Sequence, residues 1–189
     1  MSTTTAIARA VRAGIRFLRL GTILLVCAAC LWPVQGIAQG CGFYISSATP
    51  ETEARMALQF AKVGSGDVFY DLGSGDGVFV IAAANLHAKA TGIEIKPSSL
   101  DQSKVNAKGT TAKFILGDIF IIPYADATIV EINLGCGPDN YKAISRTCRI
   151  APKARILTPI DADLPDAHII TRSPAGNGSR GWSIYKCGH

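Results

Sequence analysis

The chain has 189 residues and a formal net charge of +5, from 19 basic and 14 acidic side chains. Four of the basic residues lie before position 39, so residues 39–189 carry 15 basic and 14 acidic side chains, a net charge of +1. This part therefore lacks the basic excess that draws a domain onto nucleic acid, and we expect no nucleic-acid partner. It is long enough for one domain with a single core.

Residues 1–38 have the pattern of a separate leader. Arg9, Arg12, Arg16 and Arg19 recur at helical spacing, and Leu20–Val34 is an apolar run of 15 residues. That run is short for a membrane span but suits a signal peptide, and the small residues Gly36 and Ala38 predict cleavage after Ala38. We therefore expect an exported or membrane-associated protein that contacts a membrane through its leader. Two alternatives are a lipoprotein-type cut before Cys30 and a mitochondrial presequence with a membrane anchor.

A helix is expected over residues 50–62, followed by the most informative segment of the chain. Residues 67–72 predict a buried strand that contains Asp71, and residues 77–86 predict an apolar helix. Between them, Gly73, Gly75 and Gly77 alternate in a turn where backbone and ligand can come close.

The spacing of this turn indicates which nucleotide it binds. In the dinucleotide fingerprint G-x-G-x-x-G the third glycine comes one residue later, where this chain has Val78. Asp71 precedes the first glycine by two residues, and an acid there suits a cationic ligand better than a pyrophosphate. S-adenosyl-L-methionine carries a sulfonium and an ammonium group and no phosphate. The turn therefore predicts S-adenosylmethionine as cofactor and disfavours a nicotinamide dinucleotide.

Two further acids follow predicted strands. Glu94 closes a strand over residues 90–95 and lies 23 positions after Asp71, a spacing typical of the acid that accepts the two ribose hydroxyls. Asp118 follows a strand over residues 112–116, in a position suited to the adenine amino group. Three strand-end acids in this order are a much stronger signal than the glycines alone.

The remaining elements complete an alternating pattern. We expect helices over 97–108 and 138–146, strands over 127–134 and 154–160, and a closing pair of strands over 168–172 and 181–186. Alternating strands and helices predict an α/β fold with a doubly wound, mostly parallel, Rossmann-like sheet and an antiparallel closing strand.

Other chemistry-bearing residues have simpler interpretations. Asn133 ends a predicted strand where amino-methylating enzymes hold the target nitrogen, so it is the weak catalytic candidate. Cys136 lacks the preceding proline of cytosine methyltransferases and is expected to pack. Asp161, Asp163, Asp166 and His168 could suggest a metal, but methyl transfer needs none and acidic loops are usually solvated. We expect no metal.

Four cysteines lie beyond the leader, namely Cys41, Cys136, Cys148 and Cys187. An even number after a signal sequence permits disulfides in any of three pairings. We favour the simpler expectation that they are small, buried, unbonded side chains.

Together with Thr49-Pro50-Glu51 and Asp126-Ala127-Thr128-Ile129-Val130, these motifs resemble those of class I S-adenosylmethionine-dependent methyltransferases. The resemblance covers Ala48 to about Ile160 and is closest to the small family related to the ATP-synthase subunit-c lysine methyltransferase. It implies a protein lysine as methyl acceptor. The alternative is a non-catalytic exported domain that keeps the fold. The cofactor-binding residues implied are Asp71, Gly73, Gly75, Gly77, Glu94, Asp118 and Ile119.

Overall fold

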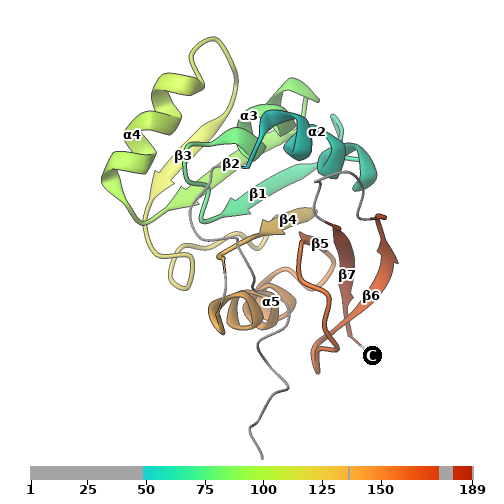
Figure 1. Ribbon diagram of the computed structural model, residues 1–189. Coiled ribbons are helices and arrows are strands. Elements are labelled where there is room, and N and C mark those ends of the chain that lie inside the picture. The colour runs from blue at the N-terminus through green and yellow to red at the C-terminus, as the bar shows by residue number, and fades with distance from the viewer. Residues whose placement is uncertain (1–48, 136, 175–180, 189) are drawn as a thin grey trace, which may run out of the picture. The chain divides into compact units, whose positions relative to one another are not determined.

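The alternating strands and helices form one seven-stranded sheet in the order β3-β2-β1-β4-β5-β7-β6 (Figure 1). The computed structural model describes residues 49–135, 137–174 and 181–188, all within a unit that spans residues 43–189. The strands are β1 (Val68–Leu72), β2 (Lys89–Glu94), β3 (Lys113–Leu116), β4 (Ile129–Ile132), β5 (Arg155–Thr158), β6 (Ala167–Arg172) and β7 (Ser183–Cys187). The helices are α2 (Glu51–Phe60), α3 (Val78–Asn85), α4 (Pro97–Asn106) and α5 (Asp139–Ile150).

The pairing of the strands confirms the predicted fold class. Strands β1 to β5 are parallel to one another, with β1 between β2 and β4. Strand β7 is antiparallel to both of its neighbours, β5 and β6. The antiparallel strand is therefore not the edge of the sheet. It is inserted between β5 and β6, a position that the strand pattern alone did not indicate.

Alternate residues of the strands face two separate hydrophobic clusters. Phe69 of β1 and Ile129 of β4 pack with α2 and α3, whereas Leu72 and Ile132 pack on the side of α5. Figure 1 shows α2 and α3 on one side of the sheet and α5 on the other. Because parallel strands end at one edge, the glycine turn after β1 lies near the ends of β2 and β4.

Strand β4 and helix α5 differ from the predicted ranges. The strand ends at Ile132 because the Asn140 side chain binds the backbone beyond it, accepting from Leu134 N at 2.9 Å and donating to the Gly135 carbonyl. The helix continues to Ile150 because its buried face extends as far as Thr147.

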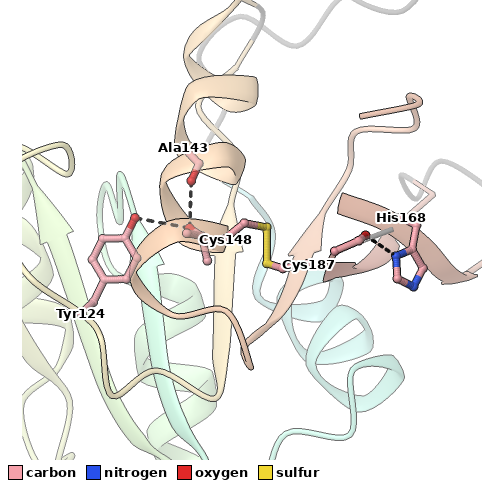
Figure 2. Close-up of a disulfide and its surroundings, with 7 residues drawn as sticks. Tyr124, Ala143, Cys148, His168 and Cys187 are labelled. Carbon is pink, nitrogen blue, oxygen red and sulfur yellow. Dashed lines mark hydrogen bonds between the residues drawn. A yellow bond between two sulfur atoms is a disulfide. The ribbon is translucent and has the colours of Figure 1, made fainter. Parts of the chain in front are cut away.

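A disulfide between Cys148 and Cys187 joins α5 to β7, as the yellow bond in Figure 2 shows. The Cα atoms are 5.2 Å apart, and the two residues are 39 positions apart in sequence. The expectation of unbonded cysteines is therefore wrong for this pair. The sequence could not reveal it, because the two residues meet only when α5 packs across the sheet beside β7. Cys41 and Cys136 lie outside the described residues.

Hydrogen bonds lie on both sides of the disulfide (Figure 2). The Thr147 hydroxyl donates to the Ala143 carbonyl at 2.8 Å and lies 3.3 Å from the Tyr124 hydroxyl. On the strand side, His168 Nδ1 lies 2.8 Å from the Gly188 carbonyl. The cysteines are thus fixed to a well-packed helix and to the end of a paired strand.

The predicted leader lies outside the described residues, so its boundary after Ala38 stays a prediction. In the part of the chain that the structure describes, no helix is long and apolar enough to cross a membrane.

Candidate active site

The three glycines of the turn after β1 all adopt positive φ angles, 90° at Gly73, 53° at Gly75 and 87° at Gly77. A Cβ atom on Gly73 would lie 2.6 Å from the Leu134 side chain, and one on Gly77 would lie 2.7 Å from the Phe114 ring. Around Gly75, by contrast, a Cβ would meet no atom within 4 Å. Packing thus requires two of the glycines, and Gly75 is the open position where a ligand can approach the backbone.

Glu94, at the end of β2, holds this turn in place. Its Oε2 accepts a hydrogen bond from Gly75 N at 2.8 Å, and its Oε1 accepts one from Lys96 N at 2.7 Å. Each carboxylate oxygen can accept a second bond, so both remain able to receive a ribose hydroxyl. The next residue, Ile95, has 64% of its surface exposed, which offers an apolar surface beside the acid.

Ser74 is a site residue that the sequence did not single out. Its hydroxyl is buried and makes no hydrogen bond within the described residues. It lies against Gly92 of β2, where an added Cβ would come within 2.5 Å of the Ser74 oxygen. Leaving a buried hydroxyl unsatisfied costs about 1–3 kcal/mol, so a polar ligand atom at this turn would stabilise it.

Asp118 and Ile119 lie in the turn after β3. Asp118 Oδ1 accepts from Phe120 N at 2.8 Å, which orients the carboxylate. The Ile119 side chain packs against the hydrophobic cluster on the α5 side, and its carbonyl accepts from Arg146 Nε at 3.1 Å. Both residues are half-buried at the end of β3, the strand next to the one that carries Glu94.

Asp71 is almost fully buried, with 3% of its surface exposed, and lies beside Glu131 of β4. Burial raises the pKa of Asp71 to about 7; a hydrogen bond with Glu131 opposes the rise, and the nearby Glu94 and Asp76 add to it. The pKa of Asp71 is therefore well above that of an ordinary carboxyl group, whereas the sequence indicated only an acid that suits a cationic ligand. Glu131 was missed, although an acid in the apolar run Ile129–Ile132 was a possible signal.

The other candidates are Asn133 at the end of β4 and the acidic residues that follow β5. Asn133 follows β4 and is half-buried, and its side chain makes no hydrogen bond within the described residues. Asp161 is paired with Arg172 at 2.9 Å. Among the described residues no group of three or more potential ligands could hold a metal ion.

The comparisons with known proteins agree with this geometry. The family described as "Methyltransferase domain" matches residues 64–175, more than half of the chain. An RNA methyltransferase from Salinibacter ruber, solved with S-adenosyl-L-homocysteine, is 30% identical with a TM-score of 0.65. That match covers 75% of this chain and 93% of the other. The chain belongs to the class I S-adenosylmethionine-dependent methyltransferases.

Two curated relatives of the methyltransferase act on proteins. It is 37% identical over 92 residues to a protein-lysine N-methyltransferase of Saccharolobus islandicus, covering 46% of this chain and 57% of the relative. It is 39% identical over 121 residues to the ribosomal protein L11 methyltransferase of Thermus thermophilus, covering 61% of this chain and 46% of the relative. The chain thus spans about half the length of these two relatives.

The residues of the methyltransferase fit its cofactor. The open backbone at Gly75, the buried Ser74 hydroxyl and the Glu94 carboxylate lie together where β1 and β2 end. Room at the backbone, a hydroxyl and a carboxylate at the strand ends are compatible with a nucleoside that has a charged amino-acid tail. S-adenosylmethionine is therefore the cofactor.

Proposed function

We propose that this methyltransferase transfers a methyl group to a protein, and specifically to the amino group of a lysine side chain. The observation that carries the proposal is the 37% identity over 92 residues to a protein-lysine N-methyltransferase. The similarity to a ribosomal-protein methyltransferase supports a protein acceptor independently of the lysine.

The proposed cofactor contacts follow from the geometry of the strand ends. Glu94 accepts the ribose hydroxyls, because its Oε2 lies at the turn beside Gly75 and both of its oxygens keep acceptor capacity. Asp118 accepts from the adenine amino group, with Ile95 and Ile119 as apolar neighbours. Gly75 lets the amino-acid part approach the backbone, while Gly73 and Gly77 act by letting the turn pack. Asp71 supplies negative charge from beneath the turn.

Bound S-adenosylmethionine supplies an activated methyl group on a sulfonium. The protein has to align the acceptor nitrogen with that methyl and exclude water. A lysine acceptor must first lose a proton, and an apolar surrounding favours this by lowering the pKa of its amine. Asn133, at the end of β4, is the proposed partner of the target nitrogen. We assign no general base.

RNA is the second candidate acceptor, because the solved methyltransferase from Salinibacter ruber is named for RNA. The near-neutral charge of residues 39–189 argues against it, since nucleic-acid enzymes gain much of their affinity from basic side chains. The two acceptor classes therefore predict different salt dependence as well as different labelled products.

An assay with radiolabelled cofactor separates the candidates. Membrane protein, soluble protein and RNA fractions of the host are offered separately, and label is expected in a protein fraction that resists nuclease. Acid hydrolysis of that fraction should yield methylated lysine. The Gly75→Val variant serves as the control without cofactor binding. Label confined to a nuclease-sensitive fraction would overturn the protein proposal, and a methylated residue other than lysine would overturn the lysine part.

We further propose that the enzyme works outside the reducing cytosol, in contact with a membrane through residues 1–38. Disulfides persist mainly in oxidising compartments, and the Cys148–Cys187 bond supports such a location. The leader pattern is an independent argument for export. Because S-adenosylmethionine is made in the cytosol, this location also requires a supply of cofactor across the membrane.

The compartment is tested on protein isolated from its native host after thiols are blocked at lysis. We expect Cys148 and Cys187 to resist alkylation until a reductant is added, and N-terminal sequencing to find a chain that starts at Gln39. A start at Cys30 would indicate a lipoprotein, and an intact start at Met1 or Ser2 an uncleaved anchor. Free thiols at both cysteines would contradict the oxidising compartment.

A further inference from the structure

Arg146 on α5 contacts the segment that follows Asp118 at three points. Its Nε donates to the Ile119 carbonyl at 3.1 Å, and its Nη2 donates to the Ile122 carbonyl at 3.3 Å. Its guanidinium carbon lies 5.7 Å from the centre of the Tyr124 ring, within the range of a cation–π contact. A guanidinium is a rigid planar fork with several donors, so one side chain can fix both the distance and the direction of the groups that it binds.

The turn that begins at Asp118 is tight and lies at the surface. The Asp118 carbonyl accepts from the backbone N–H groups of Ile121 and Ile122, both at 2.9 Å, and its side chain accepts from Phe120 N at 2.8 Å. These bonds shape the turn internally. Ile121 is 74% exposed, and the turn lies between β3 and β4, outside the paired strands. The orientation of the turn relative to the sheet therefore depends on contacts made from outside it.

Helix α5 is a fixed base for those contacts. Thr147, the residue after Arg146, is fully buried, and its hydroxyl lies 3.3 Å from that of Tyr124. Cys148, the next residue, is bonded to Cys187 of β7 (Figure 2). Three consecutive residues of α5 thus join the helix to the segment after β3 and to the far part of the sheet.

Apolar packing also holds the turn, but it does not set a direction. The side chains of Ile119 and Ile122 pack against the hydrophobic cluster on the α5 side, and hydrophobic burial is non-directional. A hydrogen bond from a ligand, by contrast, weakens steeply when its angle becomes poor. The two bonds from Arg146 to backbone carbonyls are therefore the contacts suited to orienting the Asp118 carboxylate.

We propose that Arg146 is a positioning residue that holds the Asp118 carboxylate in line with the adenine amino group, and that it thereby sets the preference of the enzyme for an amino-substituted purine. The inference rests on the proposed contact between Asp118 and adenine. Arg146 acts through the turn, since both of its hydrogen bonds go to protein carbonyls. A merely stabilising arginine would affect every ligand of the site alike. A positioning arginine affects the part of the affinity that the amino group contributes.

The test is a cycle of ligand and protein changes, measured by calorimetric titration of the full chain. The ligands are S-adenosylhomocysteine and its analogue in which hydrogen replaces the adenine amino group. The wild type should bind the analogue about 10- to 100-fold more weakly, the range for losing a hydrogen bond to a charged group. In Arg146→Gln this affinity ratio should fall close to that of Asp118→Ala, in which the acceptor is absent.

Two further variants separate charge from geometry. Arg146→Lys keeps the positive charge but loses the planar fork, so it should give an intermediate ratio. Arg149→Gln removes the same charge from an exposed position of α5 and should keep the wild-type ratio. A ratio that falls in both Arg146 variants and not in Arg149→Gln supports the inference.

The opposite results are equally clear. An Arg146→Gln variant that thermal melting shows to be folded and that keeps the wild-type ratio overturns the inference, even if it binds both ligands more weakly. If that variant does not fold, an unchanged ratio in Arg146→Lys overturns it. A wild type that does not discriminate between the ligands, or a ratio that survives in Asp118→Ala, instead rejects the Asp118 contact on which the inference rests. Failure of the wild type to bind either ligand rejects the cofactor site itself.

Discussion

Replacing Gly75 by valine is expected to abolish binding of S-adenosylmethionine, with a loss of at least about 100-fold in affinity, or roughly 2.7 kcal/mol. The structure leaves the space around Gly75 open, and its φ angle is 53°. A valine side chain would fill the space where the ligand meets the backbone. The β-branched residue would also resist the positive φ angle, at a cost of about 1–3 kcal/mol in folding stability. Calorimetric titration measures the first effect and thermal unfolding the second.

Gly109 offers a matched control for this variant. It lies in the loop between α4 and β3, its φ angle is 83°, and a Cβ there would also meet no atom within 4 Å. Gly109→Val therefore carries similar backbone strain away from the cofactor. We expect it to lose a comparable amount of stability and to bind S-adenosylmethionine as the wild type does. Equal loss of binding in both variants would mean that strain, and not occupation of the ligand's space, is responsible.

Removal of the Cys148–Cys187 disulfide is expected to lower the free energy of unfolding by about 4 kcal/mol. The bond joins residues 39 positions apart in sequence. A closed loop of that size lowers the conformational entropy of the unfolded chain, and the estimate is the stabilisation that this entropy loss gives the folded state. For a domain of this size the loss corresponds to a fall in Tm of about 10 °C. Thermal unfolding of the wild type with and without dithiothreitol provides the measurement.

The double variant Cys148→Ser, Cys187→Ser isolates this bond from Cys41 and Cys136. Its Tm should match that of the reduced wild type and should not change on addition of dithiothreitol. Each single variant should lose about as much as the double, because one cysteine alone closes no loop. A reductant that lowers the Tm of the double variant as much as that of the wild type would show that another bond is responsible.

The strand-end acids and the glycine turn could be predicted because their spacing along one chain segment already reflects their positions in space. Asp71 lies on β1, Gly75 in the turn that follows it and Glu94 at the end of β2, and the connecting helix fixes which strand ends meet. Glu131 could not be found in this way. It is 60 positions from Asp71, and only the register of β4 against β1 brings the two acids together.

The charge state of Asp71 escaped prediction for the same reason, since it depends on burial and on three acids that the fold collects around it. Ser74 was not identified from the sequence because serine is common in turns. Its hydroxyl is distinguished only by being buried without a hydrogen-bond partner within the described residues. The disulfide was not predicted because Cys148 of α5 and Cys187 of β7 are distant in sequence and come together only in the folded protein. The roles of Glu94, Asp118 and Asn133 stay predictions.

The insertion of β7 between β5 and β6 also determines when this part of the sheet can form during synthesis. Strand β5 and edge strand β6 both depend on residues 183–187 for their pairing on that side, and both leave the ribosome before those residues do. Until then β5 presents an open edge, and such an edge readily pairs with other chains. In a nascent chain this part of the sheet therefore stays incomplete until residues 183–187 have left the ribosome. For a protein proposed to leave the cytosol, that delay keeps the polypeptide loose enough to be threaded through a translocation channel.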